Sequence, residues 1–252
     1  MKLHFRTYGT GEPLIILHGV FGSADNWQTL GKEFSADYKV YLVDQRNHGG
    51  SPHSDDFGYG VMADDILELM LSENIDRAHF LGHSMGGKTA MTFASYYPEK
   101  VNKLIVVDIA PKHYPPHHES IFRAFRSLKL DLIKSRQQAD EEMAYRVSNP
   151  GVRQFLLKNL TREGDQFIWK LNLDVIEQNA HKIGEALHEE DWFNGHVLFL
   201  AGDNSDYILP EDEEGIRSHF PNAVIKTVPG AGHWVHAEQP RTLSRLVIDF
   251  LK

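Results

Sequence analysis

The first half of the chain alternates short apolar runs with stretches whose apolar residues recur at helical spacing. The runs that predict buried strands cover residues 13–17, 39–43, 78–81 and 101–107. The helical stretches between them cover residues 26–34, 59–72 and 88–97. Alternating apolar and polar residues over 2–7 add an edge strand at the beginning. This order predicts a mostly parallel sheet with helices on both faces.

Polar residues stand at or just past the ends of these predicted strands. They are His18, Asp44, Ser84 and Asp108. In open parallel sheets, ligand and active sites lie beyond the carboxyl ends of the strands. We therefore expect one edge of the sheet to collect these four side chains.

The alternation of strands and helices stops between residues 111 and 195, where no buried parallel strand is predicted. Helical stretches dominate there and cover residues 120–130, 140–147, 152–160 and 174–187. Phe167, Trp169 and Leu171 alternate with polar neighbours, which indicates either a short hairpin or an extended crossing. The segment 111–195 therefore reads as a mainly helical insertion.

The C-terminal part of the chain returns to the first pattern. It contains predicted strands at 196–200 and 224–228 and a closing helix at 243–251. We therefore assign residues 1–110 and 196–252 to one α/β core and residues 111–195 to a helical cap. The Pro- and His-rich residues 113–118 would form the hinge between them.

The run at 78–81 leads into Gly82-His83-Ser84-Met85-Gly86, a Gly-x-Ser-x-Gly pattern. Alone, this pattern can arise by chance, but a strand before it and a helix after it are the context of a nucleophile elbow. A Cβ at Gly82 or Gly86 would collide there with the neighbouring strand or helix. The turn holds the serine Oγ at its apex in a strained conformation, facing the helix N-terminus where an oxyanion would form.

A serine needs a base to become a nucleophile, and the base needs a third group to orient it. His233 is the candidate base because it follows the last predicted strand in a glycine-rich loop, Gly230-Ala231-Gly232-His233-Trp234. A loop of this kind can bring an imidazole over the edge of the sheet. An aspartate between the serine and the histidine in chain order would complete the set.

The composition limits the partners that the protein can have. Of its 252 residues, 41% are hydrophobic and 24% are charged, as in a globular protein with one sizeable core. The net charge of -9 argues against nucleic acid or an anionic membrane as a partner, and the absence of cysteine excludes thiolate chemistry. No apolar run approaches the length of a membrane span. We expect a cytoplasmic monomer or homodimer without metal or cofactor.

Several motifs together resemble the α/β-hydrolase superfamily. They are Leu17-His18-Gly19, Asp44-x-Arg46-x-x-Gly49, Gly82-His83-Ser84-Met85-Gly86-Gly87 and Gly232-His233-Trp234. The stretches 44–49, 107–111 and 231–237 are similar to a narrower group of small bacterial and mitochondrial esterases. The resemblance extends from the first strand to the last helix. It implies the α/β-hydrolase fold and a serine hydrolase that cleaves short-chain carboxylic esters, with acyl-thioesters as a further substrate class.

The resemblance also assigns residues to the third catalytic position. The narrower esterase group places its acid at the position of Asp108. Many other members of the superfamily place it after the strand at 196–200, where Asp203, Ser205 and Asp206 occur here. We favour Asp108 and keep Asp206 as the alternative.

Backbone groups are expected to bind the oxyanion. The Met85 N–H just after the nucleophile and the Val20 N–H in the preceding turn are the candidate donors. Phe21 and Trp234 are candidates for the wall of the substrate pocket. His18 should hold its loop, and Asp44 and Arg46 should form an ion pair that anchors theirs.

Other functions are compatible with some of these features. A metal hydrolase is disfavoured because His233-x-x-His236 has no evident third ligand. Serine at position 84 disfavours the enzymes of this fold that use an aspartate nucleophile. Carbon–carbon bond hydrolases keep the serine and stay open as an alternative. The alternative that is not an enzyme is a receptor of the same fold, which binds a small ligand with little turnover.

Overall fold

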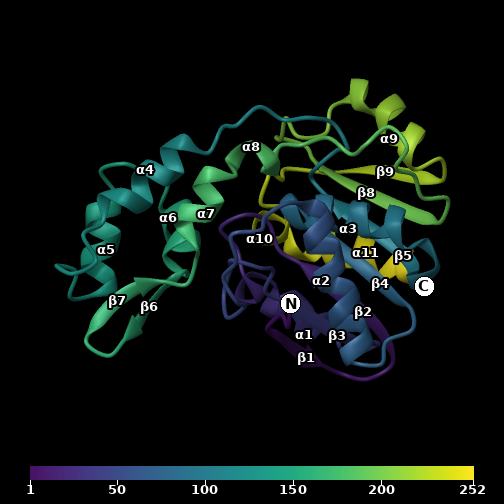
Figure 1. The fold of residues 1–252 in the computed structure, drawn as a ribbon. Helices are drawn as coiled ribbons and strands as arrows, with labels where there is room; N and C mark the ends of the chain where they lie inside the picture. The colour runs from purple at the N-terminus through teal and green to yellow at the C-terminus, as the bar shows by residue number, and fades with distance from the viewer.

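A seven-stranded sheet forms the centre of the molecule in the computed structural model, which describes residues 1–252 (Figure 1). In spatial order the strands are β1 (Phe5–Tyr8), β3 (Tyr38–Val43), β2 (Glu12–Leu17), β4 (Ala78–His83), β5 (Val101–Val107), β8 (His196–Gly202) and β9 (Ala223–Val228). All neighbouring strands pair in parallel except β1, which pairs antiparallel with β3. The sheet confirms the expected mostly parallel architecture with an added edge strand.

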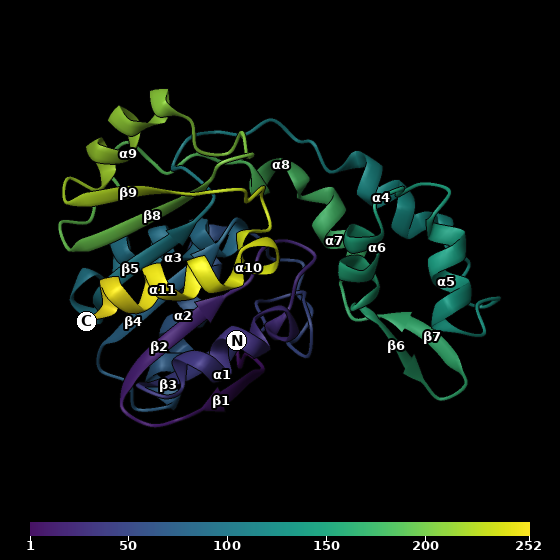
Figure 2. The ribbon, with the colours of Figure 1, turned by 180° about the vertical axis from the view of Figure 1, so that it is seen from behind.

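Helices cover both faces of this sheet, as the alternating sequence pattern predicts (Figures 1 and 2). The helices of the core are α1 (Gln28–Phe34), α2 (Tyr59–Ser72), α3 (Met85–Tyr96), α9 (Glu213–His219), α10 (Val235–Glu238) and α11 (Pro240–Leu251). Short 3₁₀ turns occur at η1 (Ala24–Trp27), η2 (Pro98–Lys100) and η3 (Pro210–Asp212). Apolar residues of α1 and α11 pack together on one face, and those of α2, α3 and α9 pack on the other.

The sequence pattern does not predict α9. This helix has the sequence Glu-Glu-Gly-Ile-Arg-Ser-His, and Ile216 is its one buried residue. A single apolar anchor in seven residues leaves no periodicity to detect. Packing of Ile216 in the core beside Phe220 stabilises a segment whose own pattern is polar.

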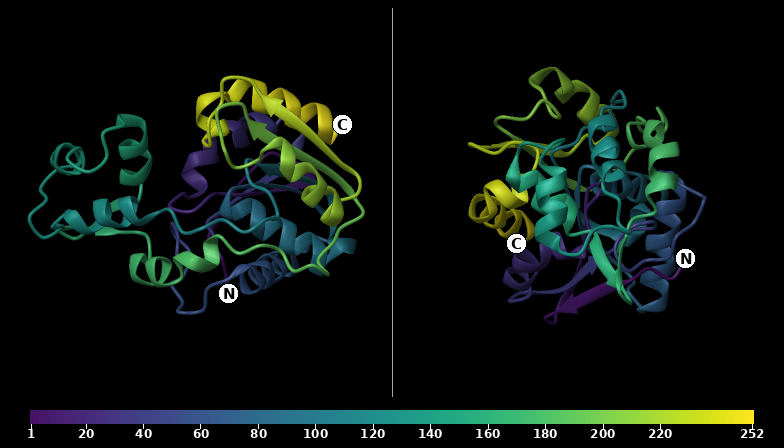
Figure 3. Two further views of the ribbon diagram at one scale, coloured as in Figure 1. Left: turned by 90° about the horizontal axis from the view of Figure 1, so that it is seen from above. Right: turned by 90° about the vertical axis from the view of Figure 1, so that its left-hand side faces the viewer.

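The segment between β5 and β8 lies to one side of the sheet (Figures 1 and 3). It contains α4 (Glu119–Ser127), α5 (Arg136–Met143), α6 (Pro150–Leu157), β6 (Leu160–Glu163), β7 (Gln166–Trp169), α7 (Leu173–Gln178) and α8 (Ala180–Ile183). The strands β6 and β7 form an antiparallel hairpin, which is the first of the two alternatives that the alternating residues indicate.

Several helices of this segment begin or break at positions other than those predicted. The helix α5 begins earlier because Ser135 caps it, its side chain accepting from the N–H of Gln138. The side chain of Asn149 caps α6 in the same way, and Pro150 opens that helix. The single helix predicted over 174–187 is wrong, since α7 ends at Gln178 and only the short α8 follows.

Apolar residues of the segment form one cluster together with several residues of the core. The core residues in this cluster are Val20, Phe21, Phe57, Tyr59, Met62 and Met85. Polar contacts add to the packing: the hydroxyl of Tyr59 donates to the Ile183 carbonyl, and Lys182 Nζ donates to the Phe57 carbonyl at 3.1 Å. Apolar and polar contacts together hold the segment against the core.

Lys88 joins the two ends of the segment to α3. Its side chain is fully buried, and Nζ donates to the carbonyl oxygens of Lys112 and Glu185, each at 2.6 Å. One acceptor lies where the chain enters the segment and the other where it leaves. Burial lowers the pKa of Lys88 to about 7.

Replacing Lys88 with methionine is expected to remove a pH dependence of stability. The unfolded chain keeps the lysine protonated up to its ordinary pKa, whereas the folded protein releases the proton near pH 7. The unfolded state thus binds more protons above pH 7, so the free energy of unfolding rises from pH 7 towards pH 10. We expect the wild type to gain roughly 1–2 kcal/mol relative to Lys88→Met between pH 7 and 9. Urea unfolding at several pH values measures the free energy of unfolding of both proteins. If this free energy changes with pH in the same way for the wild type and for Lys88→Met, the expectation is contradicted.

Candidate active site

The sharp turn between β4 and α3 places Ser84 at the edge of the sheet. Ser84 has φ +52° and ψ -119°, and its N–H donates to the Val107 carbonyl at 3.1 Å. A Cβ at Gly82 would lie 2.2 Å from the carbonyl oxygen of Gly86, and one at Gly86 would lie 2.4 Å from that of Leu17. Helix and strand therefore approach too closely for any side chain at either glycine, as the motif predicts.

Replacing Gly86 with alanine is expected to destabilise the protein by about 1–3 kcal/mol, the range for overpacked cores. The added Cβ meets backbone atoms of Leu17 and His18, which cannot rotate away. Gly215→Ala is the matched control, because that glycine lies in α9 with open space around it and alanine favours a helix. Thermal unfolding compares the two variants. Equal melting temperatures would contradict the steric argument.

The imidazole of His233 lies between Ser84 and Asp108. Its Nε2 is 3.1 Å from Ser84 Oγ, and its Nδ1 is 2.8 Å from Asp108 Oδ2. An ionised carboxylate can only accept, so Nδ1–H donates to it and Nε2 is free to accept from the serine hydroxyl. The three residues come from the ends of β4 and β5 and from the loop after β9. They form the geometry of nucleophile, base and orienting acid.

Asp108 is fully buried and held from several sides. Its Oδ1 accepts from the Gly202 N–H at 2.8 Å, and the Ser205 hydroxyl donates to Oδ2 beside His233. Its backbone has φ +52°, an uncommon conformation for a residue other than glycine. Asp206 is exposed and makes no hydrogen bond or ion pair. The structure thus brings Asp108, and not Asp206, to His233.

The two candidate oxyanion donors belong to residues next to Ser84, one in sequence and one across the cavity wall. Met85 is the first residue of α3, where an N–H has no partner within its helix. The N–H of Val20 makes no hydrogen bond within the protein. Both residues are buried, and Val20 lines the same cavity as Ser84. Unused N–H groups beside a nucleophile are what an oxyanion hole requires.

A mostly apolar cavity of about 200 Å³ opens beside Ser84 between the sheet and α6. Phe21 and Trp234, the two candidate pocket residues, both line it. The ring of Phe155 lies 6.1 Å from that of Trp234 and contributes to the wall from the segment 111–195. His118 also lines the cavity, and burial lowers its pKa to about 3, so its ring is neutral at pH 7.

Two further residues, Tyr207 and His83, contact His233 and support its position. The ring of Tyr207 stacks on the imidazole, with centroids 3.7 Å apart and planes 15° apart. His83 Nε2 lies 2.8 Å from the His233 carbonyl oxygen, and burial holds the pKa of His83 well below its usual range. The neutral ring of His83 therefore donates to that carbonyl. His83 occupies a variable position of the Gly-x-Ser-x-Gly pattern, so the pattern carries no signal for it.

The other polar residues at the strand ends have structural roles. His18 Nε2 accepts from the Gln45 N–H at 3.0 Å, and its buried Nδ1 lies 2.8 Å from the Gly19 carbonyl. The predicted ion pair between Asp44 and Arg46 does not form. Asp44 instead accepts from the N–H groups of Ala24 and Gly50.

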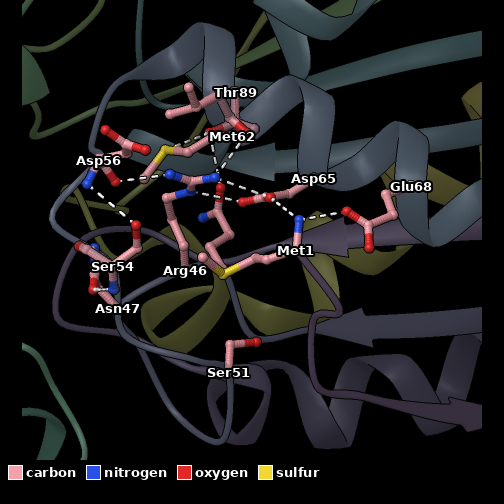
Figure 4. Close-up of polar contacts among 12 residues, drawn as sticks. Met1, Arg46, Asn47, Ser51, Ser54, Asp56, Met62, Asp65, Glu68 and Thr89 are labelled. Carbon is pink, nitrogen blue, oxygen red and sulfur yellow. Dashed lines mark hydrogen bonds and ion pairs between the residues drawn. The ribbon is translucent and has the colours of Figure 1, made fainter.

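Arg46 pairs with Asp65 on α2, through Nε at 2.7 Å and Nη2 at 3.0 Å (Figure 4). The amino group of Met1 contacts the same carboxylate at 2.6 Å. Arg46 also donates to the Asp56 carbonyl, which fixes the loop between β3 and α2. Its role is to anchor a loop, as expected, but with a different partner.

No group of three or more His, Asp or Glu side chains is arranged to hold a metal ion. His236, the nearest histidine to His233 in sequence, instead stacks on Trp27 with ring centroids 4.7 Å apart. None of the helices is both long enough and apolar enough to cross a membrane.

Known proteins resemble this chain over nearly its whole length. A family model described as alpha/beta hydrolase fold matches residues 12–135. The sn-1-specific diacylglycerol lipase ABHD11 of Mus musculus is 40% identical over 246 residues, covering 94% of this chain and 80% of the relative. Esterase YbfF of Escherichia coli is 35% identical over 259 residues, covering 100% of this chain and 99% of the relative. A solved structure described as a marine microorganism esterase has a TM-score of 0.96 at 43% identity, covering 99% of both chains. These likenesses confirm the resemblance that the sequence motifs indicate.

Proposed function

This chain belongs to the α/β-hydrolase family and is an ester hydrolase, and we propose that it cleaves short-chain carboxylic esters and acyl-thioesters through an acyl-enzyme on Ser84. The observation that supports this most directly is the bridging position of His233. Its two ring nitrogens lie within hydrogen-bond distance of Ser84 Oγ and Asp108 Oδ2. A base that contacts both nucleophile and acid is the requirement for covalent catalysis by serine.

In the acylation step, Ser84 Oγ attacks the carbonyl carbon while its proton passes to His233 Nε2. The buried carboxylate of Asp108 stabilises the imidazolium that results. The N–H groups of Val20 and Met85 donate hydrogen bonds to the carbonyl oxygen and stabilise its negative charge. His233 then gives its proton to the departing alcohol or thiol, and the acyl group stays on Ser84.

Deacylation repeats the same steps with water as the nucleophile. His233 takes a proton from the water, and the second tetrahedral oxyanion uses the same two N–H groups. When the carboxylic acid leaves, His233 returns the proton to Ser84 Oγ and the free enzyme is restored. No metal or cofactor is needed. Oxygen and sulfur leaving groups depart by the same route, so this machinery suits thioesters as well as esters.

The cavity supports a preference for small acyl groups. Its volume of about 200 Å³ lies below the range of about 300–1,000 Å³ that is usual for drug-sized ligands. Phe21, Trp234 and Phe155 give it apolar walls. We assign residues 111–195 the role of a cap because Phe155 and His118 of this segment line the cavity that also contains Ser84.

The test uses p-nitrophenyl acetate, butyrate and octanoate, with an acyl-CoA of each chain length, and mass spectrometry after treatment with a serine-directed phosphonate. We expect a burst of p-nitrophenol, turnover that declines towards octanoate, and one phosphonate adduct on Ser84. Turnover without an adduct would contradict the acyl-enzyme. Tight binding of the ester with turnover near the uncatalysed rate would instead favour a receptor.

A further inference from the structure

Phe21, the residue after the proposed oxyanion donor Val20, has a backbone conformation that is unusual for an aromatic residue. Its φ is +61°, in the left-handed region. It is the third residue of a turn that the Gly22 N–H closes by donating to the Gly19 carbonyl at 3.0 Å. A positive φ at this position normally requires glycine or asparagine. The turn therefore needs other contacts to hold it.

Those contacts come from the cap, which contacts both the side chain and the backbone of Phe21. The Phe21 ring is 3% exposed and packs against three rings of the cap. These rings belong to His118, Phe122 and Phe125, with centroids 5.3–5.5 Å away. On the backbone side, Asn159 Nδ2 donates to the Phe21 carbonyl at 2.7 Å. The backbone contact is specific, because it fixes the peptide plane that follows Phe21.

Asn159 is itself held rigidly. It is 2% exposed and follows the end of α6. The side-chain Nδ2 of Asn159 also donates to the Leu156 carbonyl at 3.1 Å. The backbone carbonyl of Asn159 accepts from the Lys170 N–H at 2.9 Å. The amide therefore reaches Phe21 from a fixed point in the cap. Because both the backbone and the side-chain amide of Asn159 are held by hydrogen bonds, the position of the Phe21 carbonyl follows the position of the segment that carries Asn159.

We propose that Asn159 is a positioning residue for the oxyanion hole, so that the hole is complete only when the cap is seated on the core. Without the contact, Phe21 relaxes to a negative φ, the peptide plane between Val20 and Phe21 rotates, and the loop with the Val20 N–H shifts relative to Ser84. The inference rests on the proposed function, since it needs an oxyanion to form there. It makes the cap part of the catalytic apparatus as well as a wall of the pocket.

The test compares Asn159→Ala with the matched control Asn172→Ala. Asn172 is also a cap asparagine, and its Nδ2 donates to Asn47 Oδ1 of the core at 3.0 Å, away from the oxyanion loop. We expect Asn159→Ala to lower kcat for p-nitrophenyl butyrate by about 10- to 100-fold with KM changed less than about threefold, because loss of an oxyanion donor acts on the transition state. The control should change kcat less than about threefold.

A ketone pair separates positioning from general destabilisation. Addition of Ser84 Oγ to a trifluoromethyl ketone gives a hemiketal oxyanion, with the hydroxyl proton moving to His233, whereas the matched methyl ketone binds without addition. We expect Asn159→Ala to lower the affinity for the trifluoromethyl ketone by the same factor as it lowers kcat. The affinity for the methyl ketone should stay unchanged. If the alanine variant does not fold, Asn159→Ser serves instead, since its hydroxyl is one bond shorter and cannot reach the Phe21 carbonyl.

Three results would overturn the inference: kcat retained within twofold in the folded Asn159 variant, an equal loss in Asn172→Ala, or equal weakening of both ketones. Failure of the proposed function has a different signature. In that case the wild type itself shows neither ester turnover nor a phosphonate adduct on Ser84.

Discussion

Ser84→Ala is expected to lower kcat by about 10⁵- to 10⁶-fold, because it removes the hydroxyl that lies 3.1 Å from His233 Nε2 and would attack the substrate. The residual rate would come from the oxyanion hole and from substrate binding alone. KM should change little, since the removed hydroxyl acts in the reaction and contributes little to ground-state binding. The measurement is steady-state hydrolysis of p-nitrophenyl butyrate, with the phosphonate adduct followed in parallel. We expect no adduct on the variant.

Two comparisons make this result specific. Ser84→Ala/His233→Ala should be no slower than Ser84→Ala, because a base without its nucleophile has nothing to activate. Ser95→Ala should keep the wild-type rate, since Ser95 lies on the same helix with its hydroxyl bonded to the Met91 carbonyl. A Ser84→Ala enzyme within tenfold of wild type would refute the acyl-enzyme. A further loss in the double variant would mean that His233 acts independently of Ser84.

Asp108→Asn is expected to lower kcat by about 10⁴-fold while the protein stays folded. An amide at this position can donate to His233 Nδ1, which then favours the tautomer with its proton on Nε2. That nitrogen faces Ser84 Oγ at 3.1 Å and could no longer accept the hydroxyl proton. The amide has the same size as the carboxylate, so the packing at this fully buried position is retained. Stopped-flow and steady-state assays should show the burst and the turnover lost together.

Asp206→Asn is the matched control for this substitution. Asp206 is exposed, makes no hydrogen bond or ion pair, and follows β8, the strand beside β5 in the sheet, where the sequence motifs leave the alternative acid. We expect its kcat to stay within about twofold of wild type. The reverse outcome, with Asp206→Asn inactive and Asp108→Asn active, would show that His233 moves to a different partner during the reaction.

These predictions depend in unequal measure on sequence and structure. The elbow was predictable because its requirements are local: two glycines within a few residues of Ser84, a strand before it and a helix after it. The steric clash that a Cβ would cause at Gly82 and Gly86 follows from those neighbours. The position of His233 was predictable for a similar reason, since a glycine-rich loop after the last strand can reach the same edge.

The choice of acid was not local, and the sequence left it open. Asp108 and Asp206 both follow strands of the parallel sheet, and both precede His233 in the chain. Only the packing of β5 beside β8 decides which of them is buried against the Gly202 N–H and the Ser205 hydroxyl. The ion-pair partner of Arg46 was not local either, because the packing of α2 beside this loop brings the Asp65 carboxylate to 2.7 Å from Arg46 Nε.

The sequence by itself determined where the strands of the central sheet and the helices α1, α2, α3 and α11 lie along the chain. It also determined the turn that presents Ser84 and the mainly helical segment after β5. Each follows from periodicity, glycine sterics or apolar run length, which neighbouring residues impose on one another. The tertiary structure alone decided that Asp108 meets His233, that Tyr207 stacks on it, and that Asn159 holds Phe21 from 138 residues away. Such contacts join segments that are independent along the chain, so they exist only once the sheet and the segment 111–195 have packed together.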